Sequence, residues 1–228
     1  MADEGTGLAG MLTLALDTCT PEGVLALGYG GDLIAEARFA ARKGATGSLV
    51  PLVDSLTRSE GFTPASLELV AVGVGPGTFT GVKVGVATAK ALALALGIPL
   101  LGMGTLDILA AGAPRGGSVL AAVDAGQGML YAALYRDGAG LERATEYLYV
   151  SPPELAAVVE ESASGEIVLA GAAPEALAAA LEERDMPFRR GQESIVASAM
   201  LRLAARASAE ADPLGALSVR PLYLKRPA

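Results

Sequence analysis

Short apolar runs of strand length open the chain and then give way to segments with helical spacing. Three such runs lie at 11–17, 24–29 and 33–40, and the turn between the last two has the glycine-rich composition of a tight hairpin. Over 44–61 the apolar residues recur at i, i+3, i+4 and i+7, which is the stripe of an amphipathic helix. The pattern therefore predicts three antiparallel strands followed by a helix.

Strands and helices then alternate up to residue 112. We expect a strand buried on both faces at 69–74, a helix at 81–96, a short strand at 98–102 and a short helix at 105–111. Such an alternation produces a largely parallel sheet with helices on its faces. Three antiparallel strands followed by these crossovers form the core pattern of the actin/hexokinase-like fold.

After a linker at 113–117 the pattern begins again. The segments LTLALDTCTPEGVLAL and VLAAVDAGQGMLYAAL are weakly similar, which indicates two related halves. In the second half we expect strands at 119–124, 129–135, 142–150 and 167–169, helices from 151, over 174–184 and over 194–211, and an extended tail from 218.

We therefore predict an α/β protein with the actin/hexokinase-like (ribonuclease H-like) fold and two related lobes. The N-terminal lobe is expected over 11–112, after a disordered segment 1–10, and the C-terminal lobe over 113–228. The final helix is expected to pack back on the first lobe.

The absence of histidine restricts the chemistry of this chain more than any other feature of its composition. Without histidine the 228 residues cannot form a Ser-His-Asp triad, a Cys-His dyad or a histidine-ligated metal site. We therefore expect no catalytic constellation and no metal site. The single cysteine, Cys19, excludes an intrachain disulfide, fits a reducing cytoplasm and is more typical of a buried residue than of a reactive thiol.

The charge of the chain argues against direct contact with nucleic acid. The net charge is −8, and binding to a phosphate backbone relies on Lys and Arg displacing counterions. The most apolar stretch, 84–101, contains Lys90 and Pro99 and so does not predict a membrane span. We expect a cytoplasmic protein that does not enter a membrane.

Asp17 and Asp124 each follow a buried-looking strand and precede a turn. In actin-like phosphotransferases, acids at such hairpins help to hold a metal–nucleotide complex. An aspartate at a turn more commonly accepts hydrogen bonds from its own backbone amides. The sequence leaves open whether these two residues cap turns or bind a nucleotide. We treat Asp17 and Asp124 as a candidate vestigial nucleotide site.

A glycine-rich loop joins a predicted strand to a predicted helix. It lacks the Gly-Lys-Ser/Thr ending of a Walker A loop and the glycine spacing of a dinucleotide fingerprint. Its amides could bind an anion at the helix N-terminus, but a tight turn that needs glycine is the favoured interpretation on physical grounds. The loop residues are Gly75, Pro76, Gly77, Thr78, Phe79, Thr80 and Gly81.

The helix after this loop has one nearly smooth face, because Gly81, Gly85, Ala89 and Ala93 recur every four residues. Glycine within a helix costs about 1 kcal/mol relative to alanine, so close packing must offset it. That packing could be against the protein's own sheet or against a partner. Periodicity favours neither alternative.

Four segments, in this order, resemble the TsaB (YeaZ) family from Met11 to Arg226: LTLALDTCT, GVGPGTFTGVKVGVATAKALA, VLAAVDAGQGMLYAALY and PLYLKR. The resemblance implies a non-catalytic paralogue of the transferase TsaD, which it binds and activates. With the ATPase TsaE, these proteins support formation of threonylcarbamoyladenosine on tRNA. It further implies that the complex uses ATP while this chain alone holds no cofactor, that tRNA is contacted indirectly, and that the chain alone forms a homodimer.

The resemblance also implies where the partner binds, because family interfaces use the first two helices of the N-terminal lobe. The interface residues expected here are Leu49, Leu52, Val53, Leu56, Val82, Lys83, Val86 and Lys90. The chain departs from the family at Lys83, which is often Arg, at Gly126, which is often Arg, and near 44–47, where a His is common.

Two other functions compete with the partner subunit. The first is a small-molecule kinase or ATP-binding protein of the same superfamily, using Asp17 or Asp124. The second is a peptidase, because relatives are sometimes labelled glycoproteases. The residues of this chain give no support to a peptidase.

Overall fold

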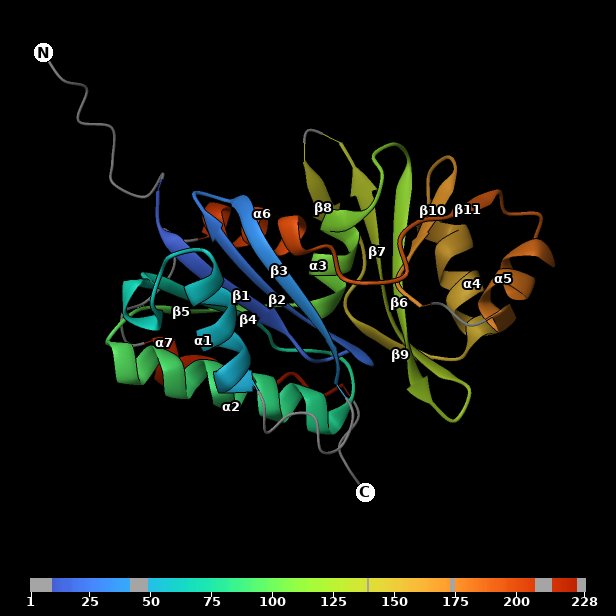
Figure 1. Cartoon of the computed structure of the whole chain (residues 1–228). Coiled ribbons are helices and arrows are strands. Elements are labelled where there is room, and N and C mark those ends of the chain that lie inside the picture. The colour runs from blue at the N-terminus through green and yellow to red at the C-terminus, as the bar shows by residue number, and fades with distance from the viewer. Residues whose placement is uncertain (1–9, 42–48, 139, 173–174, 208–214, 225–228) are drawn as a thin grey trace, which may run out of the picture.

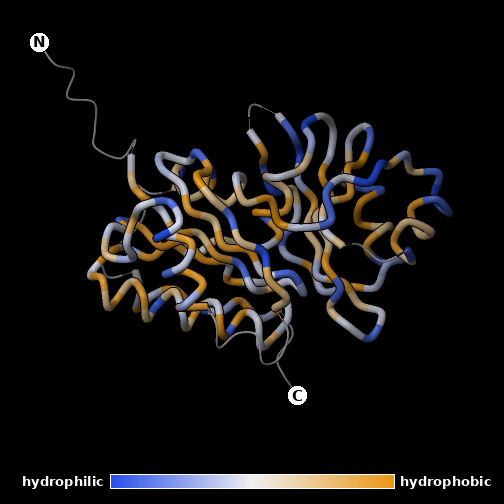
Figure 2. Tube along the Cα trace, viewed as in Figure 1, coloured by the Kyte–Doolittle hydropathy of each residue, from blue (hydrophilic) through white to orange (hydrophobic). Residues whose placement is uncertain are grey.

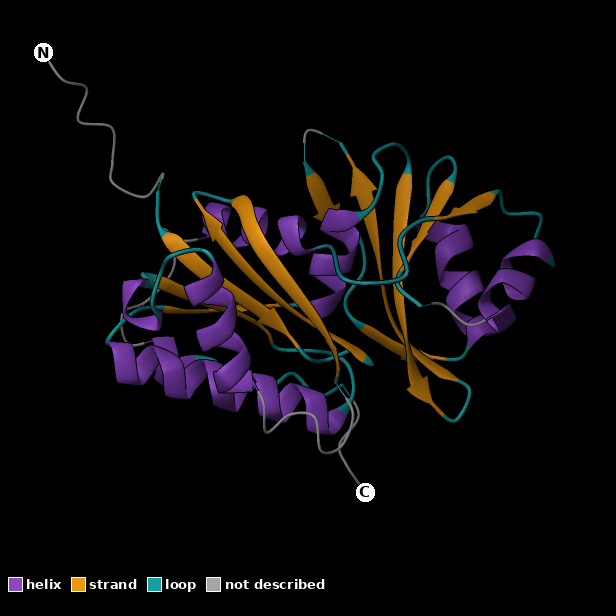
Figure 3. Cartoon of the chain, viewed as in Figure 1, coloured by secondary structure: helices purple, strands orange, loops and turns teal. Residues whose placement is uncertain are grey.

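The computed structural model describes residues 10–41, 49–138, 140–172, 175–207 and 215–224. Two β-sheets lie side by side, each flanked by helices (Figures 1 and 3). The predicted segment 1–10 lies outside the described residues except for Gly10, and so does the predicted helical start at 44–48.

The first sheet has the strand order β3-β2-β1-β4-β5. Strand β1 pairs antiparallel with β2 and parallel with β4, which confirms three antiparallel strands followed by crossovers. The strands are β1 (Leu12–Asp17), β2 (Glu22–Tyr29), β3 (Asp32–Ala40), β4 (Leu69–Gly73) and β5 (Leu100–Met103).

Helices cover both faces of this sheet (Figure 1). On one face lie α1 (Leu49–Ser59) and α2 (Phe79–Leu96), whose inner side chains join those of β1, β2 and β4 in one apolar cluster. On the other face lies α6 (Ala197–Ala207), which packs on β1, β2 and β3. The remaining elements of this part are η2 (Pro64–Ser66), α3 (Thr105–Gly112) and α7 (Gly215–Ser218).

The second sheet has the order β11-β10-β6-β7-β8, with β9 paired to β7 beside this path. Its β6–β7 hairpin corresponds to the β1–β2 hairpin of the first sheet, and β10 continues it in parallel. The elements are β6 (Ser118–Gly126), β7 (Met129–Asp137), β8 (Leu141–Arg143), β9 (Leu148–Val150), α4 (Pro152–Ser162), β10 (Ile167–Ala170), α5 (Glu175–Glu182) and β11 (Phe188–Arg190).

Two predictions for the second half were wrong. The single strand expected at 142–150 is divided into β8 and β9, because the Leu134 amide donates to the Thr145 hydroxyl (3.0 Å) and the backbone ladder is interrupted there. Strand β11 was missed, because three residues of which two are arginines carry no apolar run.

A single apolar cluster connects the two halves. It contains side chains from the first sheet, such as Ala71, from the second, such as Ala121, and from α3 and α6, such as Leu109 and Met200. Figure 2 shows the hydrophobic positions running along the strands of both sheets. The core therefore crosses the boundary between the two halves.

Candidate functional site

A cleft of about 750 Å³ opens between the two halves, and we call it the central cleft. It is lined by the β1–β2 turn, the glycine-rich loop, the β6–β7 hairpin and the C-terminal tail. Its charged lining residues, among those the structure describes, are Glu22, Asp124 and Glu193. Glu22 pairs with Arg38 at 2.7 Å, but no basic residue is among the described lining residues. The acidic lining therefore disfavours an anionic ligand in this cleft.

Asp17 does not face the central cleft. Its carboxylate is buried, accepts the Cys19 amide at 2.7 Å and the Thr105 hydroxyl at 2.9 Å, and fills the space left by the missing side chain of Gly73. Burial raises the pKa of Asp17 to about 6. The proposal of Asp17 as part of a nucleotide site is therefore corrected: it is an internal acceptor that fixes the β1–β2 turn.

Asp124 occupies the equivalent hairpin of the second sheet but is exposed and lines the central cleft. Its carboxylate accepts the amide of Gly126 at 2.8 Å, as expected for an aspartate that caps a turn. Of the two acids, only Asp124 is among the described residues that line the central cleft, and Asp17 is buried behind the β1–β2 turn. Among the described residues, no group of three or more His, Cys, Asp or Glu could hold a metal ion.

The glycine-rich loop packs against the β1–β2 turn. The amide of Thr78 donates to the carbonyl of Cys19 at 2.8 Å, and a side chain at Gly77 would overlap that carbonyl. Gly75 has φ +98°, and its carbonyl accepts the amide of Thr105 at 2.9 Å. Glycine is needed here for close approach and for a left-handed backbone, in agreement with the tight-turn interpretation.

The smooth face of α2 is used within the chain. A side chain at Gly81 would overlap the carbonyl of Thr18, and one at Gly85 would overlap its hydroxyl. That hydroxyl donates to the carbonyl of Gly81 at 2.6 Å, which fixes the helix on the turn. By length and composition alone α2 could cross a membrane, but core helices pass the same test, and the inner face of α2 packs in the core.

An exposed aromatic pair stands at the mouth of the central cleft. The rings of Phe79 and Tyr223 have centroids 5.3 Å apart, and the ammonium of Lys83 lies 3.7 Å from the Phe79 centroid. The tail that carries Tyr223 is held by a hydrogen bond from the Leu222 amide to the Val74 carbonyl at 2.8 Å. Reasoning from periodicity missed Tyr223, although it lies within the PLYLKR segment.

The expected interface residues on α1 and α2 divide into two groups. Lys83 is exposed, and Leu52 and Lys90 are half-buried. The others are buried in the protein's own core and cannot contact a partner in this structure: Leu49, Val53, Leu56, Val82 and Val86. This part of the prediction was wrong, because the apolar stripe of each helix packs on its own sheet.

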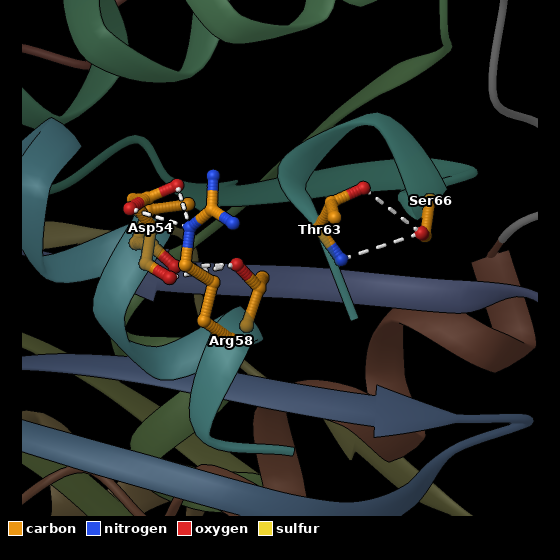
Figure 4. A network of polar contacts seen from close by, with 6 residues as sticks. Asp54, Arg58, Thr63 and Ser66 are labelled. Carbon is orange, nitrogen blue, oxygen red and sulfur yellow. Dashed lines mark hydrogen bonds and ion pairs between the residues drawn. The ribbon is translucent and has the colours of Figure 1, made fainter. Parts of the chain in front are cut away.

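The outward side of these helices carries different residues. On α2 the exposed positions include Ala87, Ala91 and Leu94, and on α1 they include Val50. Further along α1, Arg58 pairs with Asp54 at 2.8 Å, and the following turn is fixed by contacts between Thr63 and Ser66 (Figure 4). The outer surface is thus apolar in part and polar toward the end of α1.

Comparisons with known proteins agree with this fold. The sequence model of the TsaD family, tRNA N6-adenosine threonylcarbamoyltransferase, matches residues 39–227. The chain therefore belongs to this family. No curated protein matches the chain at a significant level.

Two structures from Pseudomonas aeruginosa are similar over nearly the whole chain. One is YeaZ, with 27% identity and a TM-score of 0.72, and the other, described as similar to the peptidase YeaZ, has 28% identity and a TM-score of 0.75. Both cover 94% of this chain and 100% of their own. These matches place the chain in the TsaB (YeaZ) group, and the TsaD family model supports a role in tRNA modification.

The fold is also shared with a sugar kinase. The inorganic polyphosphate/ATP-glucomannokinase of Arthrobacter sp. strain KM has 14% identity and a TM-score of 0.50, over 89% of this chain and 99% of its own. At this identity the likeness concerns the fold alone. It confirms the predicted actin/hexokinase-like architecture.

Proposed function

We propose that this chain is a partner subunit, without catalytic activity of its own, that binds and activates a TsaD-type transferase for threonylcarbamoyladenosine modification of tRNA. The observation that carries the proposal is a set of exposed apolar side chains on the α1–α2 side of the first sheet. We call this set the docking face. It consists of the large side chains Val50, Phe79, Leu94, Leu217 and Tyr223, together with Ala87 and Ala91 on the outer side of α2.

The docking face has the character of a protein contact surface. Leu94 is 59% exposed and Val50 55%, although both lie on helices whose inner sides are fully packed. Exposed apolar side chains that gather on one surface typically mark an interaction site. On α2, Lys83, Ala87, Ala91 and Leu94 follow one another at helical spacing and form one outward stripe.

The remaining partners follow from the same proposal. A TsaE-type ATPase completes the assembly, ATP is used by the complex and not by this chain alone, and the free chain forms a homodimer through the docking face. The chain's net charge of −8 favours contact with tRNA through the transferase rather than directly. We propose a cytoplasmic location for this assembly.

A kinase is the second candidate, favoured by the shared fold and by the size of the central cleft. Against it stand the acidic lining of the cleft and the Cys19 amide, which is already bonded to Asp17. A peptidase has less support, because the chain has no histidine and the thiol of Cys19 is buried, with its pKa raised by burial and by the charge of Asp17.

The test is size-exclusion chromatography with light scattering on this chain mixed with the TsaD protein of the same source. We expect a one-to-one complex that Leu94→Glu or Ala87→Glu weakens at least about tenfold, since each places an unpaired charge in the contact. The matched control is Ala179→Glu, at a helix position on α5 that is also exposed. It should leave the complex intact.

Activity gives the second half of the test. Together with TsaD and TsaE, the chain should restore threonylcarbamoyladenosine formation, and the two docking-face variants should reduce it while Ala179→Glu does not. If no complex forms at micromolar concentration and no modification is restored, the partner-subunit proposal is wrong. Binding of Mg–ATP by the isolated chain in calorimetry would then favour the kinase.

A further inference from the structure

A second cavity, of about 570 Å³, lies between α3, α6 and the strands β7 and β8. Its volume falls within the range of small-molecule sites, roughly 300–1,000 Å³. Small apolar side chains such as Ala110 and Ala199 form part of its lining. We call it the arginine pocket, because its lining includes Arg115, Arg143, Arg202 and Arg206.

The arginine pocket concentrates positive charge in an acidic protein. Four of the 17 basic residues of the chain line it, although the net charge is −8. Asp107 is the only carboxylate among the described lining residues. Like charges around one cavity repel one another, and an anion within the cavity relieves that repulsion.

Two of the arginines are held in position by neighbours. The guanidinium of Arg143 lies 4.2 Å from the centroid of the Tyr147 ring, and its Nη1 is 3.6 Å from Asp107 Oδ1. Arg115 pairs with Asp137. Such contacts reduce the side-chain entropy that binding a ligand would otherwise cost.

Arg202 and Arg206 differ from these two. Both are exposed, and within the described part of the chain no carboxylate forms an ion pair with either. They stand one helical turn apart on α6 and therefore project from the same side of that helix. Two planar guanidinium groups in this relation can each bind a phosphate through paired hydrogen bonds.

We propose that the arginine pocket binds a small organic phosphate, with Arg202 and Arg206 as its main phosphate contacts. The concave shape and the apolar part of the lining suit the organic portion of such a ligand. A long polyanion such as RNA would also meet the acidic surface outside the pocket, which disfavours it. The proposal is independent of the docking face.

The test is titration calorimetry on the full chain with four probes: AMP, pyrophosphate, adenosine and an oligoadenylate. We expect AMP and pyrophosphate to bind with a Kd below about 1 mM, and adenosine, which lacks phosphate, not to bind. Arg202→Gln combined with Arg206→Gln should weaken AMP binding about tenfold or more, because two charged donors are lost.

The matched control is Arg184→Gln combined with Arg189→Gln, which changes the net charge equally. These arginines pair with Glu160 and Glu166, away from the pocket. AMP affinity should be unchanged in this control. Thermal unfolding checks that both double variants fold. If the variant with Arg202→Gln and Arg206→Gln does not fold, Arg206→Gln alone takes its place.

Three results would overturn the proposal. The first is no binding of AMP or pyrophosphate at millimolar concentration. The second is binding that survives the loss of Arg202 and Arg206 or is lost equally in the control. The third is an oligoadenylate that binds through the same arginines more tightly than AMP and with a steep salt dependence, which would indicate an RNA contact instead.

Discussion

The turn at Thr18 and Cys19 is where three distant parts of the chain meet. The loop amide of Thr78 bonds to the carbonyl of Cys19, and Gly81 of α2 packs on that of Thr18. Asp17 fixes the turn from inside. The Cys19 amide, a turn donor that could otherwise meet an anion, is thus already bonded to Asp17.

Asp17 gives the protein a pH dependence that can be measured. The folded chain holds the proton of this buried carboxyl up to about pH 6, whereas the ordinary pKa is 3.8. Between these values the folded state binds more protons than the unfolded state, so this group's contribution to stability falls as pH rises through that window and stays low above it.

Asp17→Asn should remove this contribution. The amide can still accept from the Cys19 N–H and can donate to the Thr105 hydroxyl. We expect the free energy of unfolding of the variant, minus that of the wild type, to increase between pH 4 and pH 7.5 by on the order of 2 kcal/mol. Urea unfolding at a series of pH values measures this difference.

The control for this measurement is Asp124→Asn, because Asp124 caps the equivalent hairpin but is exposed. It leaves the buried carboxyl of Asp17 in place, so the fall in stability across this pH window should persist in the control. If the free energy of unfolding changed with pH in the same way in the wild type and in Asp17→Asn, Asp17 would not be the group that lowers stability as pH rises.

At the scale of elements, α2 has two sides with separate roles. The inner side packs within the chain: Gly81 and Gly85 lie against Thr18, and Val86 joins the apolar cluster of the first sheet. The outer side belongs to the docking face. A helix with this division can be altered on one side without affecting the other, which separates folding from partner binding.

Neighbouring positions on α2 should therefore respond differently to the same change. Val86→Glu buries an unpaired charge (Val86 is 3% exposed) and should lower the free energy of unfolding by roughly 3 kcal/mol or more. Ala87→Glu lies on the outer side and should change it by less than about 0.5 kcal/mol. Urea unfolding of the two variants measures both values, and equal losses would contradict the assignment of the two sides.

At the scale of the whole molecule, the two halves are connected by α3 and α6. The cluster around these helices contains side chains from both sheets. Polar contacts reinforce this connection: Asp107 of α3 accepts the hydroxyl of Tyr135 at 2.7 Å and that of Tyr147. We therefore expect the chain to unfold as one cooperative unit.

Asp107→Ala tests the connection between the halves. It leaves the buried hydroxyl of Tyr135 without its acceptor and should lower the free energy of unfolding by about 1–3 kcal/mol. Asp54→Ala removes only an exposed pair with Arg58 and should cost less than about 1 kcal/mol. Transitions followed by circular dichroism and by tyrosine fluorescence should coincide in both variants. Separate transitions in the wild type would contradict a shared core.

The sequence determined the features that depend on local periodicity. The strand runs, the amphipathic stripe of α1 and the glycine requirement of the loop are visible along the chain, because side-chain spacing reflects strand and helix geometry directly. The fold class followed from the order of these elements. Where a strand was short or contained charged residues, as at β11, the apolar pattern was too weak to predict it.

The tertiary structure decided everything that depends on which surfaces meet. Asp17 and Asp124 occupy equivalent hairpins, yet Thr105 and Gly73 enclose only the first. The spacing of Gly81 and Gly85 predicted a close neighbour but not that Thr18 is that neighbour. Burial arises from contacts between residues far apart in the chain, and local periodicity holds no information about those contacts.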